Sequence, residues 1–553
     1  MTVLGRLAAA VAASGALAAW GAAPAVGPLT QAVPLAEYRT VRYVAPGGSD
    51  RDGHGSKAKP WATAGYAIAQ VGPASQAARA AVLVAGGTYR ESIELKPYVD
   101  LFGGYDAGNW TRDLARFASV LDGENKRRLV LGADHARIDG FTLTRGRVRG
   151  KGGAILCDRT SPTISNNTFL DNGTLAPENW KPAALHETAN DGGAIAALNG
   201  AAPVIERNLF AWNRTENGRG AAIACDHEAS PRILANVIVQ NQTGLNDPMR
   251  SSDGGGISIY DHSNPLVREN VIAANRTWNR NDAGGIFVAL WSSARIENNW
   301  ILGNSASDDA GGIFIGGQKH HYGTPLDPVP PAGSFVVRLE GNTIMGNTNP
   351  TRNSGASRMA MQARVELCNN LIANNGGGLY LQSSAMVARN NTIVDDMLLL
   401  NDGKASRELP GPTVLAGNIL WGKADVRMDV MLTKNDFRGH ADGSNIDRDP
   451  MFVDDGWNGP AIALRRDPAR AVTWLRLEGH NGSAALAGRV IRFDSFWTAV
   501  RSGGMNAISV WGVVPEELGE GPMRVEILPS YRLRPESPCM NAGENGASLG
   551  ARK

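Results

Sequence analysis

The chain is poor in cysteine, in net charge and in helix-forming stretches. Its 553 residues include four cysteines, and these lack the CxxC or metal-ligand spacing of a zinc site. Lys and Arg number 55 against 53 Asp and Glu, so the basic stripe of a nucleic-acid-binding protein is not expected. Runs rich in Leu, Ala, Glu and Lys are missing beyond the N-terminus, whereas Gly is abundant at 66. This balance favours many short strands joined by tight turns.

A long apolar run occurs at the N-terminus, and no second segment is apolar enough to cross a membrane. Arg6 precedes the run from Leu7 to Trp20, and Ala23-Pro24-Ala25 offers the small residues of a cleavage site. We expect residues 1–25 to be a secretory signal peptide and residues 26–42 a linker. An uncleaved anchor is the alternative, although the run is short for a bilayer span.

A self-similar segment recurs through the middle of the chain. Gly192-Gly193-Ala194-Ile195 leads to Pro203-Val204-Ile205, then to Asn208-Leu209-Phe210 and Asn213, and the copies return at variable spacing. A fixed pattern with variable spacing predicts constant strands and variable loops, stacked as a solenoid. The first Asn of each copy is Asn167, Asn208, Asn236, Asn270, Asn299, Asn342, Asn370, Asn391 or Asn418.

Stacking of the copies predicts an apolar core and an asparagine ladder. The strand after each pair of glycines alternates inward and outward. Its inward column is apolar throughout: Cys157, Ala197, Cys225, Ile259, Val288, Ile315 and Leu381. The asparagines that recur with the repeat would hydrogen-bond between coils. N-glycosylation of sequons such as Asn213-Arg214-Thr215 is the alternative.

Motifs at both ends of the chain carry a resemblance. The opening motifs are Tyr43 to Asp50, Pro60 to Thr63, Gly86 to Tyr89 and Gly103 to Tyr105; the closing ones are Asp449 to Val453 and Ser537 to Gly543. They are similar to those of secreted bacterial right-handed parallel β-helix proteins of the pectate-lyase-like superfold. The resemblance implies an all-β, right-handed parallel β-helix outside the cytoplasm, secreted, periplasmic or on the cell surface. It does not fix an activity, because that group mixes lyases, hydrolases, epimerases and proteins of unknown role.

The repeat and these motifs divide the chain. Residues 43–127 are expected to form an N-terminal cap and the first coils, with a short helix from Pro60 to Val71. The β-helix core would occupy residues 128–456. A small β-rich insertion would follow at 457–530, and a C-terminal tail at 531–553.

Two polar columns flank the strand that follows the paired glycines. The first column lies four residues before the first inward residue of this strand. It contains Lys151, Asp191, Arg219 and then three carboxylates, Asp253, Asp282 and Asp309. These three, here called the acidic column, would stack roughly 5 Å apart and suit Ca²⁺. The alternative is that each Asp caps the backbone of its own turn.

The second column follows the strand and gathers histidines. It contains Asp226-His227, Tyr260-Asp261-His262 and, in an insertion, Lys319-His320-His321-Tyr322. His beside a carboxylate is suited to proton transfer near neutral pH. We predict His227, Tyr260, Asp261, His262 and Lys319 as catalytic residues. A Lys or His base would take the C5 proton of a uronate, and Tyr would protonate the leaving oxygen; a solvated turn edge is the alternative.

The two columns are expected to lie on the order of 15–20 Å apart, on either side of one face. Aromatic residues on and beside that face, Phe287, Phe314, Trp291 and Tyr380, would stack against sugar rings. The alternative is that the insertion at 316–334 folds back over Phe287 and Phe314.

The sequence therefore favours an exported carbohydrate-active protein that grips an acidic polysaccharide and cleaves it by β-elimination. Two alternatives stay open. One is a non-catalytic surface or adhesion β-helix. The other is a glycoside hydrolase that uses paired Asp residues.

Overall fold

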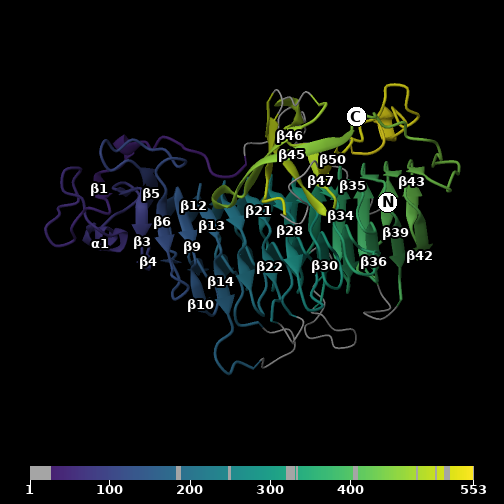
Figure 1. The fold of residues 1–553 in the computed structure, drawn as a ribbon. Helices are drawn as coiled ribbons and strands as arrows, with labels where there is room; N and C mark the ends of the chain where they lie inside the picture. The colour runs from purple at the N-terminus through teal and green to yellow at the C-terminus, as the bar shows by residue number, and fades with distance from the viewer. Residues whose placement is uncertain are drawn as a thin grey trace.

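The computed structural model describes residues 26–181, 188–246, 251–318, 331, 334–402, 409–480, 484–504, 507–515 and 523–551. Most strands stack into three long parallel sheets that share one axis (Figure 1). The 14-stranded sheet runs from β1 (Thr40–Val44) to β43 (Met431–Thr433), the 12-stranded sheet from β4 (Ile93–Glu94) to β42 (Ala424–Arg427), and the 13-stranded sheet from β3 (Gly87–Tyr89) to β44 (Asp436–Phe437). The expected signal peptide and Lys319 lie outside the described residues.

Each coil of this parallel β-helix contributes one short strand to each sheet. In one coil, β15 (Ile195–Leu198) belongs to the 12-stranded sheet, β16 (Val204–Glu206) to the 14-stranded sheet and β17 (Leu209–Ala211) to the 13-stranded sheet. A fourth strand, β18 (Arg214–Thr215), joins a short five-stranded sheet that runs from β10 (Arg147–Arg149) to β26 (Arg276–Thr277). The predicted solenoid is confirmed.

The predicted inward column is the core of the solenoid. Cys157 pairs in register with Ala197, and Ala197 with Cys225. Each member of the column is at most 1% exposed. One position of the column was missed: Met359, in β33 (Ser357–Ala360), lies between Ile315 and Leu381, in the coil whose first Asn is Asn370. Its turn reads Ser354-Gly355-Ala356 and lacks the paired glycines, which explains why the pattern did not reveal it.

The asparagine ladder is confirmed and is longer than expected. The Nδ2 atom of Asn270 donates to Asn299 Oδ1 and to Ile233 O, both at 2.9 Å, and its Oδ1 accepts from the backbone N of Asn236 at 2.8 Å. Several backbone groups at this bend are thereby paired by side chains of the neighbouring coils. The ladder continues through Asn435 and Asn445. A second ladder consists of Asn172, Asn213, Asn241, Asn275, Asn304, Asn347 and Asn375.

We predict that Asn270→Ala lowers the free energy of unfolding by about 1–3 kcal/mol, because it leaves buried backbone groups unpaired. Chemical denaturation measures the change. Asn458→Ala is the matched control, since Asn458 is exposed on the C-terminal domain. Equal losses in the two variants would contradict the ladder's contribution to stability.

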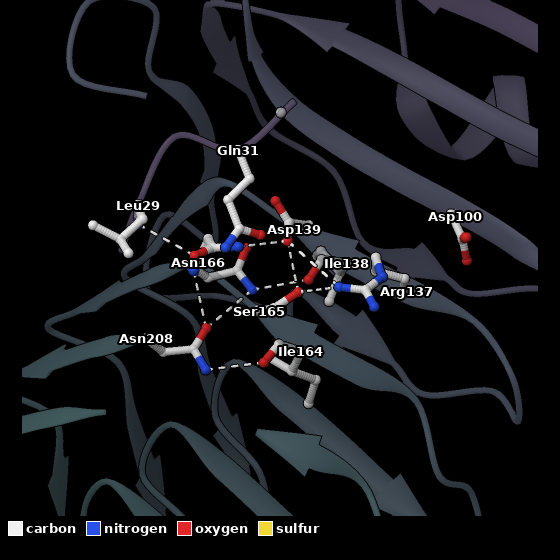
Figure 2. Close-up of polar contacts among 12 residues, drawn as sticks. Leu29, Gln31, Asp100, Arg137, Ile138, Asp139, Ile164, Ser165, Asn166 and Asn208 are labelled. Atoms are coloured by element: carbon white, nitrogen blue, oxygen red, sulfur yellow. Dashed lines mark hydrogen bonds and ion pairs between the residues drawn. The ribbon is translucent and has the colours of Figure 1, made fainter. Parts of the chain in front are cut away.

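The first end of the solenoid is closed by a helix and by the chain that precedes β1. Helix α1 (Ala64–Gln70) begins at its N-cap Thr63, whose side chain accepts from the backbone N of Tyr66. Upstream, the backbone N of Leu29 donates to Asn166 Oδ1 at 3.2 Å, as Figure 2 shows. Asn166 Nδ2 also donates to the buried carboxylate of Asp139 at 2.8 Å. The N-terminal segment is therefore tied to the outside of the coils.

Six antiparallel strands form a closed barrel after the solenoid. They are β45 (Trp457–Asp467), β46 (Val472–Leu477), β47 (Val490–Phe493), β48 (Phe496–Gly503), β49 (Ala507–Trp511) and β50 (Met523–Ile527). The barrel lies against one side of the solenoid (Figure 1). Trp497 and Trp511 pack there against residues of the 13-stranded sheet, including Val237. A Cβ on Gly346, which has φ +71°, would lie 2.2 Å from the Trp497 ring, so this contact requires glycine.

Among the described helices, none has the length and apolar character needed to span a bilayer.

Candidate functional site

Positive-φ glycines bend the chain back over the outer face of the 12-stranded sheet. Gly152, Gly192, Gly220 and Gly254 have φ between +63° and +76°. A Cβ on Gly192 would lie 2.4 Å from the carbonyl oxygen of Ile195, three residues ahead. The residue before each glycine therefore comes to lie over the strand that follows it. For this reason the outward positions of β15 and of β19 (Ile223–Asp226), Ala196 and Ala224, are buried.

This reversal brings the two polar columns into contact. Lys151 Nζ, from the first column, lies 2.8 Å from Asp191 Oδ2 and 2.9 Å from Asp226 Oδ2, and Asp226 belongs to the second column. The expected separation of the columns was therefore wrong, because it underestimated how sharply the chain reverses at the glycines. Burial opposes the charge on Lys151, yet Asp191 and Asp226 raise its pKa above the ordinary value.

Arg219 forms the next layer of this network. Its guanidinium carbon lies 3.9 Å from the centroid of the Tyr260 ring, and its Nε lies 4.0 Å from Asp253 Oδ2. Arg219 and Tyr260 are 3% and 6% exposed. The Tyr260 hydroxyl is itself buried, and burial raises its pKa. The prediction that Tyr260 protonates a leaving sugar oxygen is therefore wrong in this structure, since that oxygen could not reach the hydroxyl.

Four residues at the solvent-facing rim of the network, Asp226, His227, Asp261 and His262, are here called the histidine edge. His227 lies between two carboxylates: its Nδ1 is 3.0 Å from Asp226 Oδ1 and its Nε2 is 3.6 Å from Asp261 Oδ2. His262 Nδ1 is 2.8 Å from Asp261 Oδ1. The two imidazole side chains are 56% and 47% exposed, so both are accessible.

The electrostatics of the histidine edge favour a charged His227. The hydrogen bond with Asp226 is the largest cause that raises the pKa of His227, and the charge of Asp261 adds to it. Burial would raise the pKa of Asp226, but His227 and Lys151 hold it well below its usual range. The edge thus combines an imidazolium with a second histidine whose orientation a carboxylate fixes.

Three residues of the histidine edge lie in a left-handed turn. His227, Asp261 and His262 have φ of 53°, 51° and 57°, in the left-handed region. Leu290 and Trp291 adopt the same turn in the next coil, with φ of 51° and 54°. The turn therefore recurs with the repeat, and the sequence of each coil decides which side chains occupy it.

The acidic column is stacked as expected, but its carboxylates bind the neighbouring coil. Asp253 Oδ1 accepts the backbone N–H of Asp282, and Asp282 Oδ1 accepts that of Asp309, both at 2.9 Å. Burial, followed by the charges of Asp253 and Asp309, raises the pKa of Asp282 well above its usual range. Carboxylate oxygens of Asp282, Asp308 and Asp309 lie within 4.8 Å of one another, whereas Asp253 faces Arg219.

The predicted aromatic platform for sugar rings is wrong. Phe287, Phe314 and Trp291 are 0%, 2% and 3% exposed and belong to one buried cluster. Ala283 and Ala310 belong to the same cluster. They have φ of 55° and 58° and stand where other coils have the first glycine, so the chain reversal covers these two phenylalanines. Trp291 packs edge-on against Phe335, with ring centroids 5.0 Å apart.

Tyr380 differs from these rings because it is half-buried, and the guanidinium carbon of Arg358 lies 4.0 Å from its ring centroid. Among the predicted catalytic residues, the structure brings together His227, Asp261 and His262.

Three charged residues of the network, Lys151, Asp191 and Arg219, were assigned no role from the sequence. The sequence does contain a pattern that indicates this network, because the charge before the glycines alternates in sign from coil to coil. The residues before the glycines read Lys151, Asp191, Arg219, Asp253 in successive coils. Stacked positions of alternating sign predict ion pairs between coils.

Comparisons with known proteins agree with the fold. Residues 129–324 match the family model described as "Right handed beta helix region". Pectate lyase Pel9A is 14% identical, with 93% of this chain and 97% of that chain covered and a TM-score of 0.29. The tailspike protein gp49 of Acinetobacter baumannii bacteriophage Fri1, a capsular polysaccharide depolymerase, is 10% identical, with 82% and 80% covered and a TM-score of 0.25. No curated protein matches the sequence.

The right-handed parallel β-helix implied by the sequence motifs is therefore confirmed. The family match and the sheet topology show the fold and not an activity.

Proposed function

We propose that this is an exported protein that binds an acidic polysaccharide at the histidine edge and cleaves it by β-elimination. The observation that carries the proposal is the exposed pair of histidines around Asp261, with His262 Nδ1 at 2.8 Å and His227 Nε2 at 3.6 Å. Proton transfer at neutral pH needs such groups at the surface. The resemblance of the chain's end motifs to those of secreted bacterial β-helix proteins supports the compartment and the substrate class.

His262 is the proposed base. Its bond to Asp261 favours the tautomer with hydrogen on Nδ1, which leaves the Nε2 lone pair for the substrate. Nε2 takes the C5 proton of a uronate, the C5–H electrons form the C4=C5 double bond, and the C4–O bond to the leaving sugar breaks. The leaving oxygen then takes a proton from solvent.

His227 is the proposed electrostatic partner of the substrate carboxylate. Because Asp226 raises its pKa, His227 stays protonated to higher pH than a free imidazole. An imidazolium beside the uronate carboxylate makes C5–H more acidic and stabilises the charge that develops. Substrate affinity should therefore fall as the pH rises through the raised pKa of His227.

A non-catalytic surface β-helix is the second candidate. It is favoured by the ion pairs of Lys151 with Asp191 and Asp226, because such pairs also serve to hold adjacent coils together. Hydrolysis by paired residues of the acidic column has less support, since Asp253 and Asp282 are buried and accept backbone N–H groups.

The experiment that separates these functions is a screen of purified protein on polyuronides. Ultraviolet absorbance follows the unsaturated product, and a reducing-end assay follows every chain scission. β-Elimination raises both signals together, and hydrolysis raises reducing ends alone. If neither signal rises while the polymer is retained, the protein is a binder and the proposed cleavage is wrong.

We propose Ca²⁺ as a ligand of the acidic column, held by Asp282 and Asp309 together with Asp308. The donor set fits a hard cation, because the three carboxylates meet within 4.8 Å. Burial, and then the charges of Asp253 and Asp309, raise the pKa of Asp282, and a bound cation would offset the repulsion among these carboxylates. In this arrangement Asp253 does not bind the ion. Its carboxylate accepts a hydrogen bond from the backbone N–H of Asp282.

We predict that millimolar calcium raises the melting temperature of the parent protein relative to chelator, through mass action on the folded state. Asp282→Asn should lose this gain. In chelator near neutral pH the variant should melt above the parent. The folded-state pKa of Asp282 is raised, so its charged form opposes folding as pH rises, and Asn removes that charge. Identical melting of the parent in both buffers would leave the column as backbone caps only.

A further inference from the structure

A cavity of about 370 Å³ lies between the barrel and the 13-stranded sheet. The solenoid lines it with Val271 in β25 (Val271–Ala273) and Trp300 in β29 (Trp300–Leu302). The barrel lines it with Trp511 and with Arg501 and Ser502 of β48. Two tryptophans, of which Trp300 is 8% and Trp511 6% exposed, and one arginine thus line a single space that lies away from the 12-stranded sheet.

A β-bulge sets the position of Arg501. The pairing of β48 with β49 shifts register between Val500, opposite Val510, and Ser502, opposite Ser509. Arg501 is the extra residue, and bulges of this kind redirect a side chain. Its guanidinium carbon lies 5.0 Å from the centroid of the Trp511 ring.

Within the described part of the chain, no carboxylate balances the charge of Arg501. Its guanidinium instead lies over the Trp511 ring. Burial lowers the pKa of Arg501, and the positive charge of Arg470 lowers it further. Arg470 has its own partners, since its Nη2 donates to Ala115 O at 2.9 Å and its Nη1 lies 3.6 Å from Asp467 Oδ2. A cation beside an aromatic wall, with a second cation nearby, favours an anionic ligand with a flat, partly apolar body.

We infer that this cavity is a second sugar-binding site, which takes one end of a uronate oligomer with its carboxylate on Arg501 and a ring against Trp511 or Trp300. Its volume lies near the lower end of the range for ligand pockets, about 300–1,000 Å³, and suits one or two sugar rings rather than a long chain. The ligand class rests on the proposed function, but the site is separate from the histidine edge and is tested without turnover.

The test is a titration of the full chain with digalacturonate, followed by calorimetry and by tryptophan fluorescence. We expect saturable binding that Arg501→Gln weakens at least tenfold and that Arg501→Lys partly keeps. Arg465→Gln is the matched control, because Arg465 also lies over an indole, 3.9 Å from the Trp474 ring centroid, outside the cavity. Melting curves confirm that each variant is folded.

Equal affinity in the parent and in Arg501→Gln would overturn the inference, as would equally tight binding of neutral cellobiose. Failure of the proposed cleavage would look different: no product from any polyuronide, with the Arg501-dependent binding intact. His262→Gln should bind digalacturonate in the cavity as the parent does.

Discussion

His262→Gln should lower the rate of polyuronide cleavage by on the order of 10²- to 10⁴-fold, the usual contribution of a positioned general base. Glutamine keeps a donor for Asp261 but has no basic nitrogen. His262 is 47% exposed in its side chain, so the substitution should leave the melting temperature nearly unchanged. Initial rates of the parent and the variant at one fixed pH measure the effect.

The matched control for that loss is His54→Gln, because His54 is exposed in the N-terminal region and lies outside the network. It should retain full activity. His227→Gln should act chiefly on KM, since His227 is assigned to the substrate carboxylate rather than to the proton transfer. Unchanged rates in His262→Gln with normal folding would remove His262 as the base.

Lys151→Met should lower the free energy of unfolding by about 3 kcal/mol, because it removes the cation that Asp191 and Asp226 share. The loss should depend on pH in a defined direction. The folded-state pKa of Asp226 is depressed, so its contribution is present above the ordinary Asp pKa of about 3.9 and is lost as pH falls through that region. The pKa of Lys151 is raised, so its contribution is complete below its ordinary pKa of about 10.4.

The difference between parent and Lys151→Met should therefore be largest between these limits and should shrink in acid. Denaturant titrations at several pH values measure it, with Lys126→Met as the control, since Lys126 is exposed. A constant difference at every pH would mean that the lysine stem contributes by packing and that the ion pairs contribute nothing.

The solenoid could be predicted from the sequence because its determinants are local and repeated. The asparagine ladder and the apolar column recur at equivalent positions, and stacking at strand spacing follows from them. Asn270 illustrates this, since its partners Asn236 and Asn299 occupy the same position in the adjacent coils. Met359 was left out of the apolar column because its turn lacks the paired glycines, although Asn370 of the same coil was identified.

The site could be predicted only in part, because its geometry depends on chain reversal rather than on spacing. His227, Asp261 and His262 were identified by residue type and position. Lys151 was placed far from Asp226, although their side chains lie 2.9 Å apart, since the reversal of the chain at the paired glycines was underestimated. The same reversal buried Phe287, which an alternating pattern alone assigns to the surface. Positive φ at the first turn residue, a glycine in some coils and Ala283 or Ala310 in others, thus decides which residues can meet a substrate.

The most direct test of the central claim is a crystal structure of His262→Gln with a uronate oligomer bound. The claim predicts an ordered sugar at the histidine edge, with its carboxylate beside His227 and C5 facing residue 262. An oligomer ordered only elsewhere on the molecule, with the histidine edge exposed to solvent, would contradict it.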